Sequence, residues 1–135
     1  MKESVEAART VVRASASHGE KFLKELIKVP NGNKVGEFSL TDRRFSKITK
    51  FMATTLYDEN IGGPNGNTHI ALWSSFHDCY DGNPAKVVKA HWAELGFNDS
   101  AVHQDFISMS PRTVTAYLKN GKEKVIYKDG MFALD

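Results

Sequence analysis

The chain has 135 residues, of which 41% are hydrophobic, 25% charged and 10% aromatic. This composition is typical of a folded globular domain and excludes a disordered tail or a fibrous protein. Eighteen Lys and Arg residues against sixteen Asp and Glu residues give a net charge of +2, and the two signs are interspersed, so nucleic acid is not indicated as a partner.

The first half of the chain predicts one helix among several strands. Residues 9–16 (RTVVRASA) predict a strand, or alternatively an extension of the helix that follows. Ser17 and Glu20 have the spacing of a capping box, which predicts a helix from there to Pro30. Its apolar residues recur at helical spacing: Phe22, Leu23, Leu26 and Ile27. Residues 36–40 (GEFSL), 47–57 (KITKFMATTLY) and 68–73 (THIALW) predict strands, and the Gly- and Asn-rich residues 58–68 predict a loop.

The second half predicts another helix and a run of strands. The helix is expected to begin at Asn83, with Pro84 in its first position, and to end at Gly96. Its predicted buried residues are Val87, Val88, Trp92 and Leu95. A strand over residues 100–109 (SAVHQDFISM) precedes a C-terminal meander over 113–118, 123–128 and 131–134, with turns at Asn120-Gly121 and Asp129-Gly130.

These elements predict an α+β fold over residues 1–135 as a single domain, with a mixed, largely antiparallel sheet, at least two flanking helices and a C-terminal β-meander. The single cysteine, Cys79, excludes an intramolecular disulfide and is typical of a reducing compartment. The N-terminal residues MKESVEAARTVV lack the apolar region of a secretion signal, and no apolar run is long enough to cross a bilayer. We therefore expect a cytoplasmic protein that does not associate with membranes.

His103 and Asp105 are the first candidates for chemistry. Residues two apart on a strand point to the same face, so both side chains can converge on one point. Imidazole and carboxylate are the usual ligands of zinc, cobalt and manganese. The alternative is that His103 is an ordinary histidine and Asp105 a hydrogen-bonding group at a strand end.

Three further polar residues lie next to strands. Glu59 lies where the chain enters the glycine-rich loop and His69 where it leaves, so the loop can bring these two side chains together. Glu37 follows Gly36 in a short apolar strand, where a carboxylate faces either solvent or a cation. The alternative for Glu59 is turn chemistry, because its neighbours Asp58 and Asn60 favour turns for backbone reasons. Taken together, these residues suggest a carboxylate-rich site for two divalent ions, which would support hydrolysis.

Read in order, several segments resemble the C-terminal part of the aminopeptidase T and aminopeptidase S type of metallopeptidase, the family also called thermophilic metalloproteases. The resemblance extends over about residues 10–135. The segments that carry it are ASASHGEKFLKELI, VGEFSL, TLYDENIGG with THIAL, ELGFNDSAVHQDFISMSP and KDGMFAL.

The resemblance implies a dinuclear metal site formed here by four residues, Glu37, His69, His103 and Asp105, with Glu59 as a further metal-facing or catalytic carboxylate. It implies removal of the N-terminal residue from a peptide by a water that two divalent ions (zinc, cobalt or manganese) activate, with Glu59 as proton shuttle. It also implies peptide substrates and a homodimer.

The sequence departs from the family's pattern in three respects. A large N-terminal domain and a Thr-Gly-Glu ligand motif upstream of Glu37 are not found in this chain. Phe76 stands where the family has a tyrosine, and the insertion PNGN lengthens the loop before His69. We therefore expect this chain to be the C-terminal portion of an aminopeptidase and to have weak activity or none by itself. The alternative is a noncatalytic dimerisation or scaffolding module that keeps the fold.

Overall fold

The computed structural model describes residues 9–52 and 55–134. The chain divides into two compact units, each built from two segments. The first comprises Met1–Phe38 and Ile70–Asp105, and the second comprises Ser39–His69 and Phe106–Asp135. None of the helices in the described ranges is long and apolar enough to cross a membrane.

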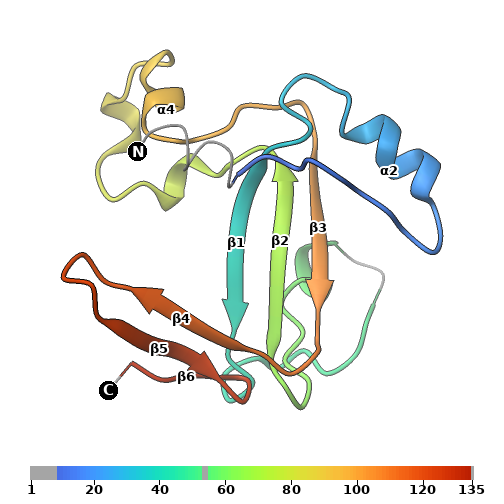
Figure 1. Ribbon diagram of the computed structural model, residues 1–135, viewed down its shortest axis with the longest axis vertical. Helices are drawn as coiled ribbons and strands as arrows, with labels where there is room; N and C mark the ends of the chain where they lie inside the picture. The colour runs from blue at the N-terminus through green and yellow to red at the C-terminus, as the bar shows by residue number, and fades with distance from the viewer. Residues whose placement is uncertain (1–8, 53–54, 135) are drawn as a thin grey trace. The chain divides into compact units, whose positions relative to one another are not determined.

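Three strands form the sheet that carries the candidate site. They are β1 (Val35–Thr41), β2 (Asn67–Trp73) and β3 (His103–Ser108), in the order β1-β2-β3. The arrow of β2 runs opposite to those of its two neighbours, so the sheet is antiparallel (Figure 1). Every residue of the central strand β2 except Ile70 is buried. The predicted strands over 36–40, 68–73 and 100–109 are therefore confirmed.

The C-terminal meander is also confirmed. It contains β4 (Thr113–Tyr117), β5 (Glu123–Lys128) and β6 (Met131–Phe132), paired antiparallel in that order. Asp129 and Gly130 join β5 to β6 with φ angles of 53° and 77°. Two consecutive positive φ angles define the type I′ turn that the Asp-Gly pair predicts. The α+β class with a C-terminal meander is thus correct, and the described strands are divided between two sheets.

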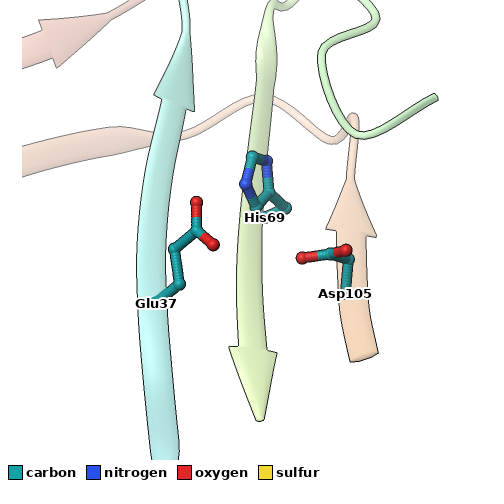
Figure 2. Close-up of side chains that lie close together, drawn as sticks. All are labelled: Glu37, His69 and Asp105. Atoms are coloured by element: carbon teal, nitrogen blue, oxygen red, sulfur yellow. The ribbon is translucent and has the colours of Figure 1, made fainter. Parts of the chain in front are cut away.

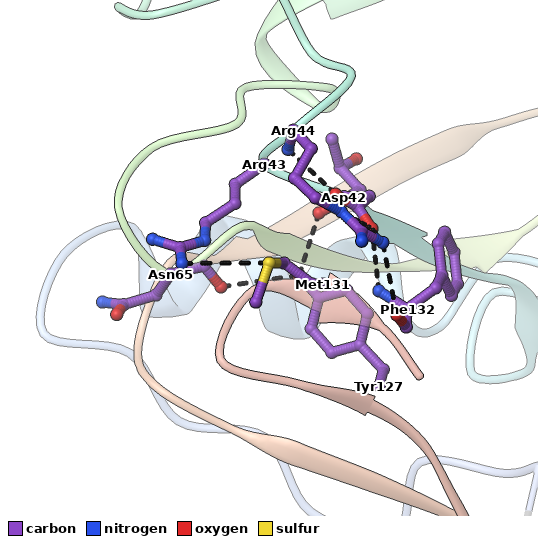
Figure 3. Close-up of polar contacts among 8 residues, drawn as sticks. Asp42, Arg43, Arg44, Asn65, Tyr127, Met131 and Phe132 are labelled. Atoms are coloured by element: carbon purple, nitrogen blue, oxygen red, sulfur yellow. Dashed lines mark hydrogen bonds and ion pairs between the residues drawn. The ribbon is translucent and has the colours of Figure 1, made fainter. Parts of the chain in front are cut away.

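Polar contacts hold the second unit together around Tyr127 and Asp42 (Figure 3). Tyr127 is completely buried, and its hydroxyl donates to the carbonyl oxygen of Thr41 at 2.8 Å. The carboxylate of Asp42 accepts the Arg44 guanidinium at 2.6 Å and the backbone N–H of Phe132 at 2.8 Å. These contacts tie the last residue of β1 to β5 and the residue after it to β6.

Helix α2 (Glu20–Leu26) is confirmed, but it begins later than its capping box predicted. Gly19 is the N-cap residue, and the Ser17 hydroxyl lies beside His18 Nδ1 at 3.2 Å, so Ser17 is two residues too early to cap the helix. Glu20 still reaches back and accepts the N–H of Ala16 at 3.1 Å.

The predicted helix over 83–96 is interrupted. Asn83 caps its start as expected, by accepting the N–H of Ala85 at 3.0 Å, but only a 3-10 turn follows, η2 (Pro84–Lys86). Val87 has extended backbone angles, which suit a β-branched residue, and the chain becomes helical again only in α4 (His91–Glu94). Of the four residues predicted to be buried there, Trp92 is buried, whereas Val88 and Leu95 are exposed.

Two strand predictions are wrong. Within residues 9–16, the only pairing is an isolated bridge from Thr10 to Lys34. Residues 47–52 form no strand, and Thr55–Asp58 form helix α3; residues 53 and 54 lie outside the described residues. β-Formers make a strand only where a partner strand runs beside them. Residues 9–11 meet residues 33–35 through two backbone hydrogen bonds and the pairing goes no further, and residues 47–52 pair with no strand of the described ranges. A further 3-10 turn, η1, covers His77–Cys79.

Candidate metal centre

Glu37, His69 and Asp105 come from the three neighbouring strands β1, β2 and β3, and their side chains point toward one another (Figure 2). Each offers a possible ligand atom, and these atoms lie within 4.8 Å of one another. Side chains on adjacent strands that leave the same face of a sheet converge in this way. The structure therefore brings together three of the five residues predicted to bind metal.

His103 adds a second imidazole to the cluster. Because it lies two residues before Asp105 on β3, both side chains leave the same face of the sheet. Its Nε2 atom lies 3.4 Å from Glu37 Oε2 and 3.4 Å from Asp105 Oδ1. The ring also packs against Phe76, with 4.8 Å between the ring centroids. Four of the five predicted ligands are thus neighbours.

The surroundings of Asp105 favour a bound cation. Its side chain is 5% exposed, and neither carboxylate oxygen has a hydrogen-bond partner within the described part of the chain. Burying a carboxylate without hydrogen bonds is costly unless an opposite charge compensates it. The ion pair with His103 compensates only when that imidazole is protonated. A divalent ion would satisfy these oxygens directly, so the residues present fit a metal.

The two histidines are oriented by backbone carbonyl groups. His69 Nδ1 lies 3.0 Å from the Glu59 carbonyl oxygen, and His103 Nδ1 lies 2.9 Å from the Ser74 carbonyl oxygen. Because a carbonyl oxygen can only accept, Nδ1 must carry the hydrogen in both rings. This assigns the lone pair of each neutral imidazole to Nε2. A histidine that ligates a metal is typically fixed in this manner through its second nitrogen.

Glu59 occupies a different position from the other predicted ligands. Its backbone carbonyl contacts His69, whereas its carboxylate lies 3.4 Å from the side-chain amide of Asn60. The group of possible ligands found among the described residues does not include it. The assignment of Glu59 as a metal-facing or catalytic carboxylate therefore stays a prediction.

Asn67 and Ser74 also support the site, and the sequence analysis predicted neither of them. Asn67 is completely buried, and its side-chain amide donates to the same Glu59 carbonyl that His69 contacts. Asn67 is the first residue of β2, and this position is the only signal that could have indicated it. The contribution of Ser74 comes from its carbonyl group, so its side chain could carry no signal at all.

Comparison with known proteins gives a consistent result. The sequence model of the family described as thermophilic metalloprotease (M29) matches residues 8–132. Aminopeptidase 2 of Geobacillus stearothermophilus is 30% identical over 129 residues, which cover 93% of this chain and 30% of that protein. Aminopeptidase AmpS of Bacillus subtilis (strain 168) is 28% identical over 127 residues, which cover 91% of this chain and 30% of that protein. The chain thus spans about a third of the length of these relatives.

Proposed function

Because the chain belongs to the thermophilic metalloprotease (M29) family, we propose that it supplies metal ligands to a metal-dependent aminopeptidase, which removes the N-terminal residue from a peptide. Two relatives that carry the name aminopeptidase support this activity. The single observation that carries the proposal is the buried carboxylate of Asp105, which accepts no hydrogen bond from the described residues and lies among Glu37, His69 and His103.

The donor set suits two divalent ions of the zinc, cobalt or manganese type. Two imidazole nitrogens come from β2 and β3, and two carboxylates, each with two oxygens, come from β1 and β3. Nitrogen and oxygen ligands of these kinds are preferred by such metals. When bound, the ions would polarise a carbonyl oxygen and lower the pKa of a water, which is the chemistry that peptide hydrolysis needs.

Within this proposal, the residues of the chain have separate roles. Glu37, His69, His103 and Asp105 hold the metal, and the Glu59 and Ser74 carbonyl groups keep the two imidazoles in one orientation. Glu59 is proposed as a further metal-facing carboxylate or as the proton shuttle, on the basis of its place in the sequence. Peptides are the proposed substrates, a homodimer the proposed assembly and the cytoplasm the proposed location.

Metal binding and peptide hydrolysis test this function separately. After dialysis against EDTA, the chain is titrated with zinc, cobalt and manganese by calorimetry, beside Asp105→Asn and the control Asp81→Asn, which changes an exposed loop residue. Loss of a group that only orients a metal ligand typically lowers metal affinity about 10–100-fold. Because Asp105 is proposed as a ligand itself, we expect Asp105→Asn to lower the affinity by more than this. The control should bind as the unchanged chain does. Equal affinity in all three proteins would contradict the proposed site.

Phe76 favours the second candidate, a noncatalytic dimerisation or scaffolding module. Its ring packs on His103 and offers no oxygen to a metal or a substrate. Release of N-terminal residues from peptides, measured with the metal-loaded product of the complete gene, separates the two candidates. Metal-dependent release supports the aminopeptidase. No release, with a stable dimer in light scattering, supports the module.

A further inference from the structure

The first unit contains a cavity of about 510 Å³ beside α4 and the start of β1. None of the four clustered metal-site residues lines it. Its volume lies within the range of about 300–1,000 Å³ that is usual for pockets that bind small molecules. Nothing in the proposed peptidase function uses this cavity, so its chemistry has to be explained separately.

Positive charge dominates the lining of the cavity. Three cationic side chains, Arg9, Lys34 and Lys89, line it, against one carboxylate, Asp99. None of the three cations forms an ion pair with a carboxylate in the described part of the chain. Cations that share one concave surface repel one another and attract an anion, because the low dielectric of the walls strengthens both interactions.

Arg9 has a donor without an acceptor. Its Nη1 donates to the carbonyl oxygen of Gly96 at 2.5 Å, which holds one nitrogen of the guanidinium in place. Its Nε–H is buried and has no hydrogen-bond partner among the described residues. A guanidinium held at one nitrogen presents the remaining N–H groups in the planar arrangement that matches the two oxygens of a carboxylate or phosphate. An oxyanion at this edge would supply the missing acceptor.

Aromatic rings form another part of the wall. The rings of His77 and Trp92 are stacked with 4.0 Å between centroids and 2° between planes, and Phe97 lies edge-on to Trp92 at 4.9 Å. All three residues line the cavity, and Trp92 is 8% exposed. Packed rings lose little conformational freedom when a ligand binds, so they provide a rigid apolar surface beside the charged groups.

We propose that this cavity binds the oxyanion group, carboxylate or phosphate, of a small molecule whose apolar part lies on the Trp92 side. Arg9 binds the anion through its Nε edge, and Lys34 and Lys89 add positive charge around it. The metal site plays no part in this binding. The proposal therefore holds or fails independently of the aminopeptidase activity.

Calorimetric titration of the EDTA-dialysed chain tests the site with four probes. They are inorganic phosphate, AMP, the dipeptide Ala-Phe and the same dipeptide with an amidated C-terminus. Binding of phosphate or AMP assigns the site to phosphate. Binding of Ala-Phe but not of its amide assigns it to carboxylate. Failure of all four probes to bind at millimolar concentration would overturn the proposal.

Three variants distinguish a specific binding site from a general attraction of anions to a basic protein. Arg9→Gln and Lys89→Gln each remove one lining charge, whereas Lys119→Gln removes an equal charge from the exposed loop after β4. We expect Arg9→Gln to weaken binding about tenfold or more, Lys89→Gln to weaken it less and Lys119→Gln to leave it unchanged. Equal losses in all three variants would contradict a specific site. Because Lys89 is exposed, Lys89→Gln keeps the test valid if circular dichroism shows that Arg9→Gln does not fold.

Discussion

Gly36 packs directly against the backbone of Ser74. A Cβ atom at position 36 would lie 2.5 Å from the carbonyl oxygen of Trp73 and closer still to that of Ser74. The Ser74 carbonyl accepts the Nδ1–H of His103 at 2.9 Å. The missing side chain on β1 therefore determines where the acceptor that orients a candidate metal ligand on β3 can lie.

Gly36→Ala should weaken metal binding without altering any ligand. Backbone atoms cannot move aside as a flexible side chain can, so the added methyl group should shift residues 73 and 74 and rotate His103. We expect a loss of about 1–3 kcal/mol in the free energy of unfolding, as for other overpacked sites. Metal affinity should fall about 10–100-fold, as for loss of a group that orients a ligand.

Urea unfolding and zinc calorimetry measure the two effects of Gly36→Ala, with Gln104→Ala, an exposed change on β3, as the control. Unchanged zinc affinity would show that the Ser74 contact does not orient His103.

Asn67→Ala tests the equivalent support on β2. The Asn67 amide and His69 Nδ1 share the Glu59 carbonyl as acceptor, so removing the amide should loosen the loop that holds His69. We expect a fall of about tenfold in metal affinity, and calorimetry with zinc measures it. Asn120→Ala, which changes an exposed turn in the meander, is the control. If both variants bind zinc equally, His69 is held by other contacts.

The sequence allowed the ligand-bearing strands to be predicted because β1, β2 and β3 each have a short run of β-formers between turn residues. Since residues two apart on a strand share a face, the pairing of His103 with Asp105 could also be predicted. The supports of the site could not. Ser74 and Glu59 act through carbonyl groups, which every residue has, and Gly36 acts through a contact with a strand more than thirty residues away.

Two of the errors along the chain have a common physical origin. Residues 47–52 are as rich in β-formers as a true strand, yet β-propensity depends on a partner strand. The Asn83-Pro84 start was recognised because a cap is a local interaction. The continuation of that helix depended on burial of Val88 and Leu95, which remain exposed. Both segments therefore failed where tertiary packing decides the structure. The start of helix α2 is a separate error, because its local capping pattern placed the N-cap at Ser17 and the structure has it at Gly19.

Tyr127→Phe should destabilise the chain at neutral pH. The hydroxyl donates to the Thr41 carbonyl at 2.8 Å, and its loss leaves a partly buried acceptor without this donor, at a cost of about 1–3 kcal/mol. Burial raises the pKa of Tyr127. Above pH of about 10 the tyrosine therefore ionises more readily in the unfolded chain, and stability falls as the pH rises. Urea unfolding at pH 7 and pH 11 should show the unchanged chain losing more of its stability than Tyr127→Phe. An equal loss in both proteins would mean that other groups cause the alkaline destabilisation.

Asp42→Asn should remove part of the acid sensitivity of the chain. Hydrogen bonds from the Arg44 guanidinium, and in addition from the backbone N–H groups of Phe132 and Arg44, hold the pKa of Asp42 well below its usual range. A carboxyl group with a depressed pKa in the folded chain stabilises it above the unfolded pKa of about 3.9, and this contribution is lost as the pH falls below that value. At pH 7 the variant should be about 1–3 kcal/mol less stable, because the donors that surround the buried Asp42 side chain lose a charged acceptor. The difference in stability should shrink between pH 5 and pH 2, as measured by urea unfolding with far-ultraviolet circular dichroism.

The control variant Asp81→Asn, in an exposed loop, should have the stability of the unchanged chain at every pH. A constant difference between Asp42→Asn and the unchanged chain over this range would show that the charge of Asp42 does not stabilise the fold.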